Sequence, residues 1–168
     1  FFTVLAIYGN TCRNGYALDD YAVIVKNSIV TKGASSIPTI FATPYLRGYI
    51  INSNDLYRPL SLAMFALEYE LFGADPAPGH VINLLFFAGC VLLLFYFFCG
   101  LFENKNIFVP FATAFLFAVH PIHTEVVANI KSRDEILSFL FIALTLLYVF
   151  LFSSSANFLS SIDCCKDL

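Results

Sequence analysis

Long uncharged apolar runs alternate with polar segments along this chain. The clearest run, residues 81–102, reads VINLLFFAGCVLLLFYFFCGLF and has 22 residues without a charge. A helix rises about 1.5 Å per residue, so roughly 20 apolar residues cross the hydrocarbon core of a bilayer. Similar runs lie at 107–119 and 136–152. The pattern therefore predicts three transmembrane helices, near 81–102, 106–122 and 135–152.

The second of these runs is shorter than a bilayer is thick. The 13 residues of 107–119 cover only roughly 20 Å as a helix. We expect this span to begin in the polar turn at 103–106, to continue past His120, or to thin the bilayer locally.

A mixed segment, residues 10–79, precedes these spans and is predicted to be a loop outside the hydrocarbon. Glycine and proline punctuate its short apolar stretches. Within it, Pro59 precedes LSLAMFALEYELF, which predicts a short helix over 60–72 at the membrane interface. Two spans return the chain to its starting side, so this loop and the loop at 120–135 share one face. Lys105 is the one basic residue of the short turn, so charge does not set the orientation.

The two ends of the sequence suggest a piece of a longer protein. Residues 1–9 begin with Phe1 rather than Met and form an apolar run too short to span a bilayer. We interpret them as the remnant of a first transmembrane helix. A signal-peptide remnant is the alternative, although no basic n-region or small-residue cleavage site is visible. Residues 153–168 are expected to be a tail or a truncated end, so that 1–152 is the N-terminal part of a transmembrane domain.

Composition agrees with a membrane protein. The chain is 59% apolar and 12% charged, whereas ordinary soluble domains carry about 25% charged residues. We therefore predict an all-α membrane protein. Nine basic residues are spread along a chain of net charge −3, which excludes a basic footprint for nucleic acid. The five cysteines show no zinc spacing or disulfide framework, and no phosphate-binding loop or GxSxG elbow is present.

Adjacent carboxylates, Asp19 and Asp20, follow the first apolar segment in the stretch GYALDDYAV. A first helix would deliver them to the membrane surface, where carboxylates act as a general base or bind a cation. The alternative is a solvated turn or a helix cap, because aspartate is common at both. The sequence does not decide between Asp19 and Asp20 as the base.

Three residues of the second loop, in HPIHTE, have the composition of metal ligands: His120, His123 and Glu125. Their spacing is not the HExxH of zinc proteases. If 121–135 is a helix, Glu125, Asn129 and Arg133 recur at i, i+4 and i+8 and form one polar stripe. Such a stripe either faces a cleft or is a solvated ladder of charges.

Basic residues of both loops are candidates for a phosphate. Arg58 precedes Pro59 at the mouth of the predicted interfacial helix, and the planar donor fork of arginine grips a phosphate well. The alternative is ordinary snorkelling to lipid headgroups. Lys131 and Arg133 in the second loop have the same two interpretations.

Five stretches, with their order and gaps, carry a family resemblance: LDDYAVIVKN, IFATPYLRGY, YRPLSLAMFALEYELFG, GHVINLLFF and FAVHPIHTEVVANIKSRDE. They closely resemble the start of the transmembrane, tetratricopeptide-repeat-containing protein O-mannosyltransferases and their bacterial homologues. The resemblance covers residues 15 to about 150, and HPIHTEVVANIKSRDE and YRPLSL are its specific parts. The residues of these motifs resemble those of the bacterial members.

The resemblance implies a fold and a reaction. That family belongs to the GT-C membrane glycosyltransferases, which share a multispan helical bundle and an acidic motif in the first extracytoplasmic loop. The match puts Asp19 and Asp20 at that motif. The implied donor is a polyprenyl phosphate sugar, with mannose as the sugar, and the implied acceptor is a Ser or Thr hydroxyl of an exported protein. Both loops would then face outward from a bacterial inner membrane, or the lumen in an endoplasmic reticulum membrane.

The same resemblance implies roles for the candidate residues. Asp19 or Asp20 would be the catalytic base. The donor-phosphate candidates are Arg133, Arg58 and Lys131, with Arg133 favoured because its loop is shorter and lies beside a membrane exit. The residues that would shape the acceptor site or the cleft are His120, His123 and Glu125. Because both loops share one face, we expect the acidic pair to approach Arg133 or His123.

Other interpretations stay open at the sequence level. The resemblance implies no certain cofactor and leaves a divalent cation open. Members of the family continue with further membrane helices and a tetratricopeptide-repeat region, which these 168 residues do not contain. A membrane scaffold or binding protein without chemistry, or an inactive truncated relic of the enzyme, is therefore the alternative.

Overall fold

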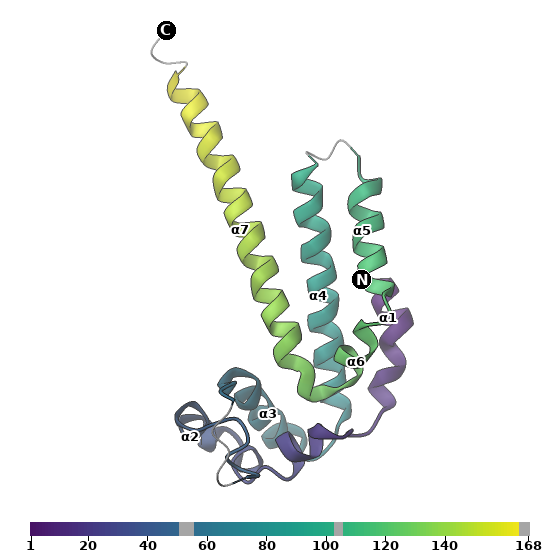
Figure 1. The fold of residues 1–168 in the computed structure, drawn as a ribbon, viewed down its shortest axis with the longest axis vertical. Coiled ribbons are helices and arrows are strands. Elements are labelled where there is room, and N and C mark those ends of the chain that lie inside the picture. Colours follow the sequence, from purple (N-terminus) through teal and green to yellow (C-terminus); the bar gives the residue numbers. More distant parts are fainter. Residues whose placement is uncertain (51–55, 103–105, 165–168) are drawn as a thin grey trace.

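Helices make up all the regular structure that the computed structural model describes (Figure 1). It describes the backbone of residues 1–50, 56–102 and 106–164, and the side chains as far as residue 153. The prediction of an all-α protein is thereby confirmed. The long helices form one part of the molecule, and the short helices of the first loop gather at one end of them.

The part with the long helices is built around α4. Its helices are α1 (Phe2–Tyr8), α4 (Ala77–Leu101), α5 (Phe108–Val119), α6 (His123–Ala128) and α7 (Arg133–Cys164). Helix α5 runs antiparallel to α4, α7 packs along α4, and α1 leans against both α4 and α5 (Figure 1). We call this part the helical bundle.

Two helices of the described residues are long and apolar enough to cross a membrane, by length and composition: Ala77–Leu101 and Ile130–Ser153. The expected span at 106–122 is instead a helix of 12 residues. Its end has a local cause, because His120 is extended (φ −66°, ψ 125°) and the residue before a proline avoids helical geometry. Part of the expected tail continues α7 to Cys164.

Short helices form a second part, which we call the loop lobe. Its elements are η2 (Tyr21–Val25), η3 (Val30–Ser36), α2 (Ile37–Ala42) and α3 (Pro59–Phe72). The short helix η1 (Gly9–Arg13) precedes the lobe in the chain and packs against α1 and α4 of the bundle. Helix α3 begins with Pro59, whose ring suits a first turn, and ends at Gly73 with φ +67°. The helix expected over 60–72 is thus present, one residue longer at its start.

The bundle and the lobe have separate apolar cores. The bundle core gathers around Leu84, Phe87 and Ala88 of α4. The lobe core contains Phe65 of α3 and Tyr45. Val127 belongs to the bundle core and Ile130, three residues later, to the lobe core. The short stretch between them therefore joins the two parts.

The segment 121–135 is not one helix. Helix α6 ends at Ala128, Asn129 is extended (φ −106°, ψ 116°), and a single 3-10 turn, η4 (Ile130–Ser132), leads into α7. The polar stripe considered from the sequence is therefore not formed. Glu125 is exposed and Arg133 is fully buried, because the break at Asn129 rotates the following residues toward the lobe.

Candidate functional site

The acidic pair meets the second loop at Lys131. The backbone N–H of Lys131 donates to Asp20 Oδ1 at 2.7 Å, and Lys131 Nζ lies 3.3 Å from Asp19 Oδ2. The two loops that were expected to share one face are therefore in contact. Their direct contact is at Lys131, two residues before Arg133.

Asp20 is completely buried. Its second oxygen accepts the backbone N–H of Ala17 at 3.1 Å. Burial raises the pKa of Asp20 above its usual value, while the N–H donors of Ala17 and Lys131 act in the opposite direction. A buried carboxylate with two backbone donors ties the first loop to the second, so the alternative of a solvated turn does not apply to Asp20.

Asp19 points the other way. Its side chain is 66% exposed, so a ligand can reach it. Leu18, just before the pair, has a φ of 39°, which is rare for a residue with a side chain and costs on the order of 1 kcal/mol. The turn thus delivers one carboxylate to the interior and presents the other outside, beside the ammonium of Lys131.

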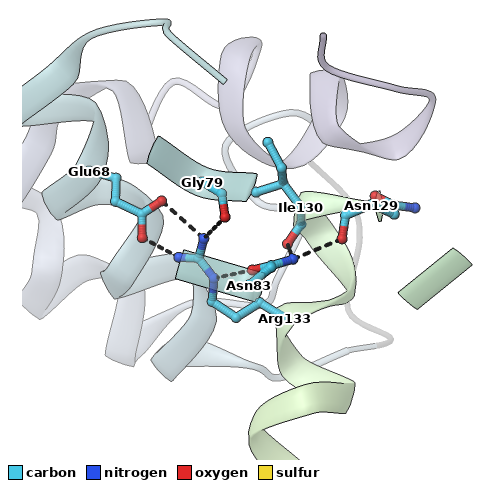
Figure 2. A network of polar contacts seen from close by, with 6 residues as sticks. All are labelled: Glu68, Gly79, Asn83, Asn129, Ile130 and Arg133. Atoms are coloured by element: carbon cyan, nitrogen blue, oxygen red, sulfur yellow. Dashed lines mark hydrogen bonds and ion pairs between the residues drawn. The ribbon is translucent and has the colours of Figure 1, made fainter. Parts of the chain in front are cut away.

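Arg133 lies at the centre of a buried polar network (Figure 2). Its Nε donates to Asn83 Oδ1 at 2.8 Å, and Nη2 donates to Gly79 O at 3.1 Å. Nη1 and Nη2 both bind the Glu68 carboxylate, and the guanidinium lies 4.6 Å from the centre of the Phe65 ring. Arg133 is fully buried and all three of its side-chain nitrogens are engaged, which leaves this residue poorly suited to hold a donor phosphate.

Asn83 holds the second loop from the side of α4. Its Nδ2 donates to Asn129 O at 3.0 Å and to Ile130 O at 3.3 Å, while Oδ1 accepts from Arg133 (Figure 2). The side chain is fully buried. An unpaired amide would cost about 2–7 kcal/mol in such surroundings, so these bonds are required for its burial.

His80 lies one turn before Asn83 on α4 and is also fully buried. Neither ring nitrogen makes a hydrogen bond of regular geometry within the described residues. Asp20 and the backbone of Gly15 lie near the ring. Sequence reasoning missed both His80 and Asn83. Polar residues at the start of an apolar run were the available signal, because such residues in membrane helices often mark functional positions.

Arg58 and Asp134 form an ion pair between the lobe and the first turn of α7. Beside it lies a cavity of about 200 Å³. Ser61 and Ser138 line this cavity together with the ion pair, and its apolar lining comes from Leu60, Pro59, Leu137 and Phe141. The cavity thus combines a cation and hydroxyls with an apolar surface on a candidate membrane helix.

Tyr45 supports this ion pair from inside the lobe. The Arg58 guanidinium lies 5.8 Å from the centre of its ring. Burial, reinforced by the Asp134 charge, raises the pKa of Tyr45, so its hydroxyl stays protonated. That hydroxyl is buried and has no hydrogen-bond partner among the described residues.

The histidines of the second loop lie on the α5 side of the bundle. The His123 ring packs against Phe117 and Phe87, with centroids 4.4 and 5.2 Å apart. Burial, and to a lesser degree His120, lowers the pKa of His123. His120 and Glu125 are exposed. No cluster of three or more His, Cys, Asp or Glu suited to a metal ion occurs in the part of the chain that the structure describes.

Comparison with known proteins gives a consistent set of homologues. The chain is 37% identical over 142 residues to Protein O-mannosyl-transferase TMTC1 of Homo sapiens, and 34% identical over 141 residues to TMTC3 of the same species. It is 35% identical over 138 residues to Protein O-mannosyl-transferase F38B6.6 of Caenorhabditis elegans. These relatives are animal proteins and give no support to the expected bacterial origin.

The alignments cover most of this chain but little of each relative. They include 83%, 82% and 78% of the chain, and 16%, 15% and 19% of the respective relatives. The chain thus spans less than a fifth of the length of these proteins. No protein-family model and no solved structure matches it.

Proposed function

From its homology to protein O-mannosyl-transferases, we propose that this chain is part of a membrane glycosyltransferase of that family. The full-length protein would transfer mannose from a polyprenyl phosphate to a Ser or Thr hydroxyl of an exported protein. The chain would supply the first part of a multispan helical bundle of GT-C type. Its loop lobe would face the outside of the cell or the lumen of the endoplasmic reticulum.

Asp19 is the proposed general base. Removing the proton of a Ser or Thr hydroxyl requires a carboxylate that the acceptor can reach, which favours the exposed Asp19 over the buried Asp20. Lys131 keeps an ammonium beside this carboxylate. Asp20 has the supporting role, because its two backbone bonds hold the acidic turn against the second loop.

Arg58 and Lys131 are the proposed contacts for the donor phosphate. Arg58 lines a cavity that continues onto the apolar side chains of α7, an arrangement suited to a lipid with a charged head and an apolar chain. A phosphate would take the place of Asp134 at the guanidinium. Arg133 is not proposed for this role, since its nitrogens are engaged by Glu68, Asn83 and Gly79.

The proposed reaction is a single displacement at the anomeric carbon. The acceptor oxygen attacks C1 of mannose and loses its proton to Asp19, while the bond between C1 and the phosphate oxygen breaks. The electron pair of that bond leaves with the polyprenyl phosphate, whose growing negative charge Arg58 and Lys131 would stabilise. His120, His123 and Glu125 remain candidates for shaping the acceptor side, with exposed His120 and Glu125 the more accessible.

One observation carries this proposal: homology to O-mannosyl-transferases coincides with a reachable carboxylate and an ammonium held 3.3 Å apart at the junction of bundle and lobe. The test is an assay of the full-length protein in membranes with polyprenyl phosphate mannose and a Ser/Thr peptide. Asp19→Asn should lower transfer by at least about 10²-fold, and Asp75→Asn, a change at another exposed aspartate, should not. An inactive wild-type protein would instead support the scaffold or relic interpretation.

The proposed orientation has its own test. Single cysteines at Asn106, beside the turn between α4 and α5, and at Glu125, an exposed position of α6 in the second loop, would be placed in a cysteine-free background. A membrane-impermeant thiol reagent should label Glu125→Cys from the extracytoplasmic side and Asn106→Cys only after permeabilisation. Labelling of both cysteines from the same side would contradict the proposal that α4 and α5 cross the membrane as a hairpin.

A further inference from the structure

We propose that Asn83 is a positioning residue for the acidic pair: its amide holds the 129–133 segment so that Lys131 meets both Asp19 and Asp20. This inference rests on the proposed function only in calling the pair catalytic. The geometric part stands on the contacts alone. Nothing in the apolar character of α4 requires an amide at this position.

The 129–133 segment cannot hold its own shape by regular helical bonds. Asn129 is extended and separates α6 from the single turn of η4. The carbonyls of Asn129 and Ile130 both accept from Asn83 Nδ2. Arg133, at the other end of the segment, donates to Asn83 Oδ1. One side chain of α4 therefore binds the segment at three of its five residues (Figure 2).

Lys131 is placed between these anchors. Its neighbour Ile130 and Arg133 two residues later are both held by Asn83, and Arg133 is locked further by Glu68. From this fixed backbone Lys131 extends in two directions. Its N–H reaches Asp20 and its ammonium reaches Asp19, so a shift of the segment would break both contacts at once.

The chain of contacts therefore runs from α4 through the second loop to the acidic turn. Asn83 contacts neither carboxylate of the acidic pair in the hydrogen bonds described, and acts through Lys131. Among the described residues, the titratable groups His80 of α4, Tyr16 and Tyr45 also interact with the pair. None of these sets the backbone of Lys131, which distinguishes Asn83 from them.

A zero-length carbodiimide cross-link tests the positioning directly in the full-length protein. Asp19 and Lys131 are close enough and exposed enough for the activated carboxyl to form an amide with the amine, detected as a joined peptide by mass spectrometry. Asn83→Leu, of similar volume, should reduce this cross-link at least about tenfold, as expected for the loss of several hydrogen bonds. Asp19→Asn is the negative control.

The matched control is Leu84→Val, which weakens packing at the adjacent buried position of α4 without removing a hydrogen bond. It should leave the cross-link intact. Turnover supplies a second readout. Asn83→Leu and Lys131→Met should each lower kcat, and the double variant should lose less than the product of the two single losses, since both changes remove the contact between the Lys131 ammonium and Asp19.

The outcomes separate this inference from the proposed function. An undiminished Asp19–Lys131 cross-link in folded Asn83→Leu protein, or additive losses of kcat, would overturn the positioning role. Loss of the cross-link together with normal transfer by Asp19→Asn would leave the positioning role intact and overturn the assignment of the base. Equal loss of the cross-link in Leu84→Val would show that general packing, not the amide, holds the segment.

Discussion

Lys131 and Asp20 are joined through the main chain of one and the side chain of the other, at 2.7 Å. A backbone donor cannot be moved by changing the lysine side chain, so this contact depends on where the second loop is held. The same residue directs its ammonium to Asp19. The acidic turn and the second loop therefore form one unit, and its parts should respond differently to substitution.

The two adjacent aspartates should separate in mutagenesis. Asp19→Asn should lower transfer by about 10²- to 10⁴-fold, the usual contribution of a general base, with little loss of folded protein. Asp20→Asn should destabilise the protein by about 1–3 kcal/mol, because the amide cannot accept at both positions and buries new donors. Mannosyl transfer per folded molecule measures the effect of Asp19→Asn, and thermal unfolding in detergent measures the effect of Asp20→Asn. Reversed effects would exchange the proposed roles.

Arg133 should behave as a structural residue. Arg133→Met removes a fully buried guanidinium and leaves the largely buried Glu68 carboxylate without its partner, which should cost about 3–5 kcal/mol. Arg133→Lys should not restore stability, because one ammonium cannot meet Glu68, Asn83 and Gly79 in the geometry of the planar guanidinium. The yield and unfolding temperature of purified protein give the answer. Stable variants with a raised KM for the donor would instead support a contact between Arg133 and the donor phosphate.

The Arg58–Asp134 pair should influence use of the donor in opposite directions. Arg58→Ala should raise the KM for the lipid phosphate about tenfold or more, since a charge-assisted bond to phosphate is lost. Asp134→Asn should lower that KM, because it removes the competing carboxylate. Donor titrations at saturating acceptor measure both, with Arg13→Ala, an exposed arginine of η1, as control. An unchanged KM in both variants would show that the donor does not bind in this cavity.

Gly48 should not tolerate a methyl group. An added Cβ would overlap with Asn27 Oδ1 and lie 2.9 Å from the Ile29 nitrogen. That oxygen accepts the N–H groups of Ile29 and Val30, so Gly48→Ala should destabilise the lobe by about 1–3 kcal/mol. Gly9→Ala has open space and is the matched control. Equal unfolding temperatures for the two variants would contradict the packing described.

His123 should make the protein sensitive to mild acid. Its pKa is lowered by burial and by His120, so the unfolded chain binds this proton near pH 6.5 while the folded protein does not. Stability should be complete above about pH 6.5 and fall as the pH drops toward the folded pKa, by at most about 1.4 kcal/mol per pH unit. His123→Phe should flatten this part of a stability profile. An unchanged profile would assign the acid sensitivity elsewhere.

The sequence by itself determined the features that depend on local chemistry. Uncharged apolar runs predict membrane helices because the hydrocarbon core of a bilayer excludes charges, and α4 (Ala77–Leu101) contains all but the last residue of the run at 81–102. Pro59 and Gly73 bound α3 for equally local reasons. Two predicted spans separate the two loops, which places both loops on one side of the membrane. Their contact at Lys131 agrees with this prediction. The adjacent acidic residues were visible as a motif.

The tertiary structure decided which of these residues is reachable. A sequence shows a charged residue but not its partner. Arg133 was therefore a candidate for the donor phosphate, although it pairs with Glu68, 65 positions earlier in the chain. Asp19 and Asp20 are neighbours in the sequence, yet one side chain is 66% exposed and the other is completely buried. The sequence did not indicate a role for Asn83, because its hydrogen-bond partners at 129–133 lie far from it in the chain. Burial and pairing depend on residues brought together from across the chain, and for that physical reason only the folded structure shows which of these side chains are buried, paired or accessible.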